Sequence, residues 1–239
     1  MKRVFPILAV LTAALLSYAL YQALVVAPTE QTMGDVQRIF YYHVPSAWTA
    51  FILFSINFVA SVAYLIRRSN NADIVALVTA EVGVVFCTVV LVTGPIWARP
   101  VWGIWWTWDL RLTLTLVLWL IYVSYLVLRR FSSSGQTPLL AAVLAIFGAL
   151  DVPLVYFSIW FFRTQHPQPV IGGGGSIDPR MLHVLLINWL AFSCFAALVC
   201  WSRYRLEVLR REVDETLALE ALLEPRGSQT RTSQTWRAG

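Results

Sequence analysis

The segment IVALVTAEVGVVFCTVVLVTGPI, residues 74–96, spans 23 residues and holds one charged residue, Glu81. About 20 consecutive apolar residues are enough for an α-helix to cross the hydrocarbon core of a bilayer. Of the 239 residues in the chain, 58% are hydrophobic and 13% are charged, whereas soluble domains carry about 25% charged residues. The sequence therefore predicts an integral membrane protein.

Five further segments have a similar length and apolar character, so we expect six transmembrane helices and an all-α fold. The predicted spans are residues 4–26, 46–66, 74–96, 112–128, 138–158 and 181–201. The first of them is longer than the apolar core of a cleaved signal peptide, about 7–15 residues, which favours an uncleaved span. We expect a transmembrane domain over residues 1–201 and a tail over residues 202–239, helical at first and disordered after Pro225.

The basic residues lie mainly on one side of these spans. Thirteen of the 18 Lys and Arg residues flank the N-terminus, follow spans two and four, or belong to the tail. The positive-inside rule assigns that side, with both termini, to the cytoplasm. The net charge of +5 is explained by these flanking residues and indicates no nucleic-acid partner. The arginines left on the outer side are Arg38, Arg99, Arg111, Arg163 and Arg180.

These outer arginines are exceptions to the positive-inside rule and therefore require an explanation. Arginine suits bidentate binding of carboxylates and phosphates, so one reason is an anionic ligand on the outer face. The alternative is contact with membrane lipid headgroups, or ion pairs with Asp35, Asp109 and Asp178. Charge alone leaves both interpretations open.

The outer segment between the third and fourth spans is rich in tryptophan. It reads GPIWARPVWGIWWTWDLRLT over residues 94–113, and five of the eleven tryptophans fall within residues 97–108. Tryptophan is common at bilayer interfaces, but an aromatic belt needs only one or two rings per helix end. The run is better suited to a flat apolar ligand that stacks on it. Pro95, Pro100 and Gly103 predict a periplasmic loop or a short interfacial helix here.

All three histidines fall on the outer side. His43 precedes the second span, His166 lies in the loop after the fifth, and His183 lies three residues into the sixth. Two neutral imidazoles can bind one metal axially. Combined with the tryptophans and the outer arginines, the pattern fits haem, with rings for the macrocycle, histidine for iron and arginine for the propionates. Spacing alone does not choose between His166 and His183 as the second ligand.

Other reactive groups give weaker indications. Cys87, Cys194 and Cys200 lie in apolar runs without a C-x-x-C pair, which predicts buried thiols rather than a disulfide or a zinc site. Glu81 and Asp151 lie inside spans three and five, and acids within a membrane often mark ion pathways. No basic residue accompanies them, so we expect a locally hydrogen-bonded packing role.

Several segments together resemble a known family. The motif WGIWWTWDLRLT is similar to the signature of the WWD-domain haem-handling proteins, and RIFYYHVPSAW, VTGPIWARPVWG, WFFRTQHPQP and SIDPRML extend the likeness to the cytochrome c maturation protein C (haem exporter protein C) family. The resemblance covers residues 34–180. It implies a bacterial inner-membrane protein that binds haem b transiently at the periplasmic face. It also implies delivery of that haem to the chaperone cytochrome c maturation protein E, in c-type cytochrome biogenesis.

The resemblance further implies partners and residue roles. Besides the chaperone, the partners are the ABC transporter formed by cytochrome c maturation proteins A and B and the small maturation protein D. His43 and His166 become the axial ligands of the haem iron, whereas His183 becomes a packing or interfacial residue. The remaining implied cofactor-binding residues are Trp102, Trp105, Trp106, Trp108, Asp109, Arg38, Arg99, Arg111 and Arg163. The segment HPQPVIGGGG, which begins at His166, departs from the short form typical of the family.

Alternative functions are distinguished by where polar groups and histidines lie. The permease subunit of an ABC-type haem exporter would need a polar path through the bundle. The only residues within the spans that indicate such a path are Glu81 and Asp151. A dihaem electron carrier normally places histidines within the spans and on both sides of the membrane. Promoting covalent attachment on a partner would be a lyase-like activity, and no catalytic residue is implied for it.

Overall fold

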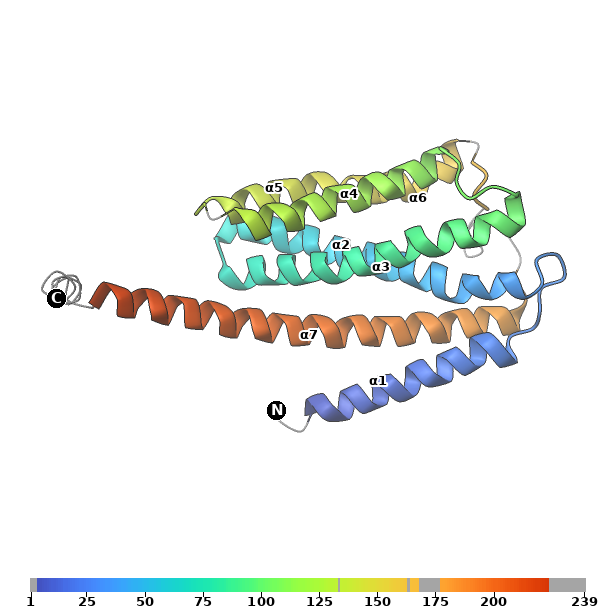
Figure 1. Ribbon diagram of the computed structural model, residues 1–239, viewed down its shortest axis with the longest axis horizontal. Helices are drawn as coiled ribbons and strands as arrows, with labels where there is room; N and C mark the ends of the chain where they lie inside the picture. Colours follow the sequence, from blue (N-terminus) through green and yellow to red (C-terminus); the bar gives the residue numbers. More distant parts are fainter. Residues whose placement is uncertain (1–3, 133, 163, 168–176, 224–239) are drawn as a thin grey trace, which may run out of the picture. The chain divides into compact units, whose positions relative to one another are not determined.

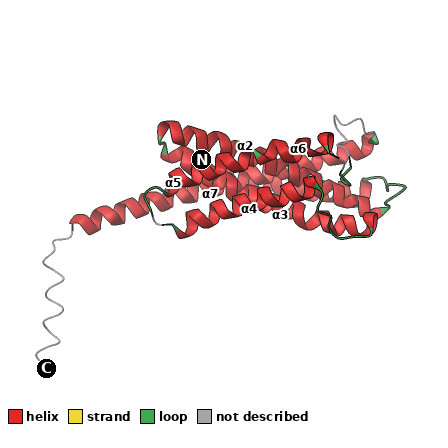
Figure 2. Ribbon diagram, turned by 90° about the horizontal axis from the view of Figure 1, so that it is seen from above, coloured by secondary structure: helices red, strands yellow, loops and turns green. Residues whose placement is uncertain are grey.

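The protein is helical throughout the part of the chain that a computed structural model describes, residues 4–132, 134–162, 164–167 and 177–223. These residues form no strand, only an isolated bridge between Glu30 and Gly34, and Figure 2 accordingly draws helices and loops. Six helical segments in this part are long and apolar enough to cross a membrane, as predicted. The elements are α1 (Val4–Tyr21), the π-helical turn η1 (Gln22–Val26), the 3-10 turn η2 (Asp35–Ile39), α2 (Phe40–Arg67), α3 (Asn70–Trp102), α4 (Leu110–Phe131), α5 (Thr137–Ala149), α6 (Asp151–Phe161) and α7 (Pro179–Leu223).

The chain divides into two units, residues 1–201 and residues 202–239, and α7 runs across the boundary. The described part of the second unit is the continuation of α7 as far as Leu223. Within it, Arg211 donates a hydrogen bond of 3.0 Å to Glu207, one helical turn earlier. Apolar side chains at helical spacing, which include Leu206 and Val213, are exposed on this helix.

The core of the first unit lies between α2, α3, α4 and α5. α2 packs along α3 and also against α5, whereas α4 packs against α3, α5 and α6 (Figure 1). At the centre, the ring of Phe54 stacks on Tyr122 with 3.8 Å between centroids. A Cβ atom on Gly83 would lie only 2.7 Å from that Phe54 ring, so glycine permits the close approach of α3 to α2.

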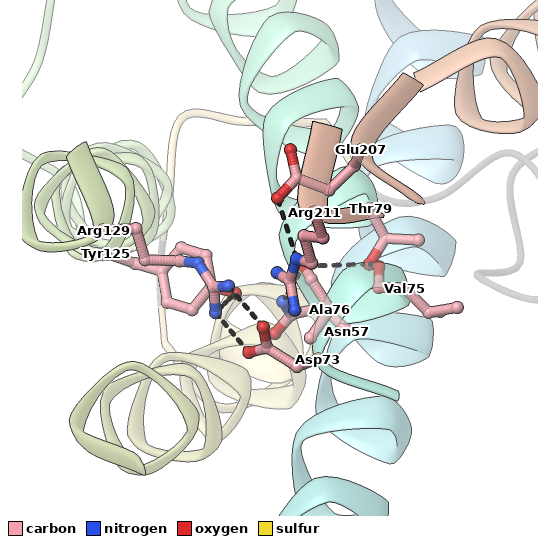
Figure 3. Close-up of polar contacts among 9 residues, drawn as sticks. All are labelled: Asn57, Asp73, Val75, Ala76, Thr79, Tyr125, Arg129, Glu207 and Arg211. Carbon is pink, nitrogen blue, oxygen red and sulfur yellow. Dashed lines mark hydrogen bonds and ion pairs between the residues drawn. The ribbon is translucent and has the colours of Figure 1, made fainter. Parts of the chain in front are cut away.

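Polar groups join the helices on the side of the core that leads to the predicted cytoplasmic end (Figure 3). The Asn57 amide on α2 donates to the carbonyl of Ala76 on α3 at 2.6 Å. Beyond it, the guanidinium of Arg129 on α4 donates to both carboxylate oxygens of Asp73 on α3, at 2.6 and 2.7 Å. The Arg129 side chain is 9% exposed and that of Asp73 is 4% exposed, so this is a buried, bidentate ion pair.

α1 packs against the part of α7 that belongs to the same unit. The Asn188 amide on α7 donates to the carbonyl of Ala19 at 3.3 Å, and the rings of Phe5 and Trp201 meet edge to face at 5.8 Å. Most of the large side chains of α1 are exposed in the isolated chain. Such an apolar surface is stable when lipid surrounds it.

The helices extend further toward the outer side than the sequence predicts. α2 begins at Phe40, so His43 lies in its first turn and not in a preceding loop. α3 continues to Trp102 with Pro95 and Pro100 inside it, so the predicted loop is confined to residues 103–109, between α3 and α4. The helix ends at Gly103, where a φ of +79° allows the backbone amide to donate to the carbonyl of Arg99 at 3.0 Å.

The fifth predicted span is interrupted near its middle. α5 ends at Ala149 and α6 begins at Asp151, with Leu150 between them. Asp151 is buried, and its Oδ2 finds no hydrogen-bond partner among the described residues. The expected local hydrogen bonding is therefore not met for this oxygen. The three cysteines are free, and Cys87 is buried.

Candidate functional site

An apolar pocket opens at the outer end of the bundle, between α2, α3, α4 and α6. The space inside it, together with the open space at its mouth, amounts to about 990 Å³. Its deep part is lined by apolar groups such as Phe51, Cys87 and Val155. The nitrogen-bearing side chains are His43, Trp97, Trp102, Trp106, Arg111 and His166. Residues that are far apart in the sequence therefore converge on one cavity.

His43 is presented to this pocket by the first turn of α2. The side chain is 8% exposed, and its Nδ1 lies 2.8 Å from Oγ1 of Thr93 on α3. The ring also meets Trp97 edge to face, with 5.9 Å between ring centroids. With Nδ1 engaged and the ring packed, Nε2 is the nitrogen left for a ligand.

His166 reaches the same pocket from the segment after α6. Its Nδ1 lies 2.9 Å from the carbonyl oxygen of Pro167, and a carbonyl only accepts, so Nδ1 carries the proton. Burial, with a smaller effect of the positive charge of Arg111, lowers the pKa of His166 from 6.5 to about 4. The imidazole is therefore neutral at physiological pH, with the lone pair on Nε2.

Asp109 and Arg111 lie at the start of α4 and have different roles. Asp109 caps the helix, since its Oδ1 accepts from the backbone amide of Leu112 at 3.0 Å and its Oδ2 accepts from Thr107 at 3.2 Å. Asp109 thus orders the end of the tryptophan-rich segment. Arg111 lines the pocket, and its buried Nη1 has no acceptor among the described residues. An unsatisfied buried cation favours an anionic group on a ligand.

The tryptophans of the predicted platform separate into two groups. Trp102 and Trp106 line the pocket, and the indole Nε1 of Trp106 is buried without a partner in the described part of the chain. Trp105 and Trp108 are 60% and 76% exposed and are not among the lining residues. Trp97 also lines the pocket, although the resemblance did not imply it as a cofactor-binding residue. Trp97 could have been found from helical periodicity, because α3 continues through this region.

Arg38, Arg99 and His183 lie outside the pocket. Arg38 donates to the carbonyls of Ala23 and Ala27 at 2.8 and 3.2 Å, so it closes the end of η1. Arg99 is exposed and donates to the carbonyl of Gly103. His183 is exposed in the first turn of α7 and is not among the pocket-lining residues. Arg163, another predicted propionate partner, lies outside the described residues.

The donor set limits which metal centre the pocket can hold. The described residues contain no group of three or more His, Cys, Asp or Glu side chains suited to a metal ion. Two imidazoles instead suit a metal that brings its own equatorial ligands, as haem iron does. Apolar walls, indole rings and an arginine with a free donor fit a flat macrocycle with carboxylate substituents.

The comparisons with known proteins agree on one family. The family described as Heme exporter protein C matches residues 1–219. Heme exporter protein C of Bradyrhizobium diazoefficiens is 36% identical over 222 residues, which cover 92% of this chain and 84% of the relative. A putative cytochrome c biosynthesis ccmC-like mitochondrial protein of Marchantia polymorpha is 31% identical over 179 residues, 74% of this chain and 76% of the relative.

Heme exporter protein C of Escherichia coli K12 is 31% identical over 199 residues, which cover 83% of this chain and 81% of the relative. With six helices able to cross a bilayer and relatives of this kind in bacteria, the protein is a multi-pass protein of the bacterial inner membrane. The match along most of the chain, at this identity, identifies it as a member of the Heme exporter protein C family.

Proposed function

We propose that this protein binds haem b transiently at the periplasmic face of the inner membrane and delivers it to the haem chaperone cytochrome c maturation protein E. Membership of the family supports a role in haem handling for cytochrome c biogenesis. The observation that carries the finer proposal is that two imidazoles, His43 and His166, line one apolar pocket with Nδ1 of each ring engaged. Both are thereby left to offer Nε2 to the same iron.

The remaining pocket residues supply the recognition of the macrocycle. Trp97, Trp102 and Trp106 provide aromatic surface, and the Nη1 of Arg111 provides a donor for a propionate. The deep apolar part of the pocket accepts the hydrophobic edge of the ring. Arg38 already donates hydrogen bonds to backbone carbonyls at η1, which makes Arg111 the better candidate to bind the propionate.

The exposed tryptophans support a hand-over role for the outer loop. Trp105 and Trp108 are largely exposed at the outer end of the bundle, next to the pocket-lining Trp106. A chaperone that docks there would meet the haem at the mouth of the pocket. Its covalent attachment would be promoted by position, because holding the two reacting groups in near-attack geometry can supply a large part of a barrier. The partners implied with the chaperone are the transporter formed by maturation proteins A and B and the small maturation protein D.

The proposal is tested by the visible spectrum of the purified protein, alone and with the chaperone co-expressed. The wild type should carry a haem b Soret band. That band should weaken in His43→Ala and in His166→Ala, and it should persist in His183→Ala, the matched control at the same side of the membrane. Loss of haem in His183→Ala, with retention in His166→Ala, would show that the ligand assignment is wrong. A wild-type protein without haem would contradict the proposed function itself.

A further inference from the structure

The contact between His43 and Thr93 carries information about which nitrogen of the imidazole bears the proton. Thr93 Oγ1 lies 2.8 Å from Nδ1 of His43 and 2.7 Å from the carbonyl oxygen of Val89, one turn earlier on α3. A hydroxyl has one proton to donate, and a carbonyl oxygen can only accept. The Thr93 proton therefore goes to Val89, and the lone pair of Oγ1 faces the imidazole. Nδ1 of His43 must then be the protonated nitrogen.

From this arrangement we propose that Thr93 is a positioning residue that holds His43 in the tautomer able to bind iron. With the proton on Nδ1, the lone pair of the imidazole is on Nε2, the nitrogen left for the pocket. In the other tautomer Nε2 would carry a proton and could not bind a metal. Outer-shell acceptors of this kind commonly fix the tautomer and orientation of metal-binding histidines. The inference rests on the proposed haem-binding function for its consequence, but not for the tautomer itself.

The surroundings of the ring fix its orientation as well as its protonation. Thr93, Gly94 and Trp97 follow one another on the face of α3 that meets α2. A Cβ atom on Gly94 would lie 3.5 Å from Cε1 of His43, so the helix backbone is close to the ring. Trp97 adds its edge-to-face contact. Two residues of α3, Thr93 and Trp97, thus contact the imidazole, and the backbone at Gly94 leaves little space beside it.

The two candidate ligands differ in which group accepts the hydrogen bond from Nδ1. The acceptor for His166 is the carbonyl of the next residue, Pro167, which no substitution removes. The acceptor for His43 is the Thr93 side chain, from a neighbouring helix and 50 positions away in the sequence. The Thr93 contact can therefore be deleted without changing either ligand, which makes the inference testable.

The test compares Thr93→Val, which keeps the shape and removes the acceptor, with Thr93→Ser, which retains a hydroxyl. Thr93→Ala removes the same acceptor without an added methyl, in case the valine disturbs packing. Thr88→Val is the matched control, because Thr88 also back-bonds on α3, to the carbonyl of Val84, but it accepts from Trp119 and not from a histidine.

The first measurement is made on haem-free protein. Nitrogen-15 NMR of protein with labelled histidine, with His43 assigned by its loss in His43→Gln, reports the protonated ring nitrogen directly. We expect Nδ1 to be protonated in the wild type and in Thr93→Ser, and a change in the tautomer population in Thr93→Val. Protonation at Nε2 in the wild type would overturn the proposal, whether or not the protein binds haem.

The second measurement uses haem titrated into the same proteins. Loss of an outer-shell partner typically weakens metal binding by about 10- to 100-fold, and we expect a loss of that size in Thr93→Val but not in Thr88→Val. The reduction potential should move upward, because an imidazole that donates from Nδ1 is a stronger ligand for ferric iron. Wild-type affinity and potential in Thr93→Val would refute the positioning role. Absence of haem binding in the wild type would refute the proposed function, while the NMR result still decides the tautomer.

Discussion

Loss of one member of the buried ion pair between Asp73 and Arg129 should strongly destabilise the folded bundle. Both carboxylate oxygens are within 2.7 Å of guanidinium nitrogens, and both side chains are less than 10% exposed. Asp73→Ala removes the carboxylate and leaves Arg129 as a buried cation beside the Tyr125 hydroxyl, which lies 3.3 Å from its Nη1. Removing one member of such a pair typically costs about 3–5 kcal/mol.

The double variant Asp73→Ala with Arg129→Met distinguishes the cost of leaving one buried charge unpaired from the net contribution of the pair to stability. Replacing both members by apolar groups is often neutral or stabilising by about 1–4 kcal/mol, because no charge is then left in a low-dielectric site. We therefore expect the double variant to be more stable than Asp73→Ala alone. The control is Asp35→Ala, since the Asp35 carboxylate is 81% exposed although it also pairs with an arginine. An exposed pair is worth about 0–1 kcal/mol.

The free energy of unfolding can be measured by reversible SDS titration in mixed micelles, with circular dichroism as the readout. A double-mutant cycle over Asp73, Arg129 and the combined variant gives the coupling energy between the two side chains. The reasoning would be refuted if Asp73→Ala cost no more than Asp35→Ala. It would equally be refuted if the two single losses simply added in the double variant, because independent sites show no coupling.

Three further predictions use the same chain. Gly83→Ala should lose about 1–3 kcal/mol in the unfolding assay because its Cβ would lie 2.7 Å from the Phe54 ring, whereas Gly135→Ala, in open space, should change little. Burial lowers the pKa of the haem-free His166 imidazole to about 4, and iron bound at Nε2 would compete with the proton, so the haem spectrum should be unchanged from pH 7.5 down to about pH 4; loss of the spectrum with a midpoint near 6.5 would contradict the assigned ligand. Arg111→Gln should weaken haem binding in a titration, while Arg111→Lys should retain part of it; equal affinity in all three proteins would argue against a propionate partner.

The number and location of the spans could be predicted from the sequence because lipid imposes a simple requirement. A segment without internal hydrogen bonds is too costly in hydrocarbon, so apolar length alone indicates a helix. Proline misled the prediction at the outer end of α3, where Pro95 and Pro100 lie within the helix. Each proline removes one backbone hydrogen bond, but the rest of the turn can be retained when side chains pack around it.

The candidate site could be predicted by residue type more readily than by orientation. Histidine, tryptophan and arginine on one side of the membrane are visible in the sequence, but whether Trp105 or Trp97 faces inward depends on helical phase and on where α3 ends. The use of Arg38 by the carbonyls of Ala23 and Ala27 is a long-range contact that no local pattern reveals. The Thr93 acceptor was missed for the same reason, since it is brought to His43 by the packing of α2 on α3.

The two halves of the bundle differ in how tightly their helices pack, and this difference bears on the permease alternative. The outer half contains the pocket, whose lining includes Phe51 and Val155. Beyond it lie the Phe54–Tyr122 stack and then the bonds of Asn57 to Ala76 and of Tyr122 to Asn57, at 2.6 and 3.3 Å. A macrocycle could pass along this axis only if these contacts between helices were broken. The packing therefore favours a protein that receives and presents haem on the outer side over one that conducts haem through its own centre.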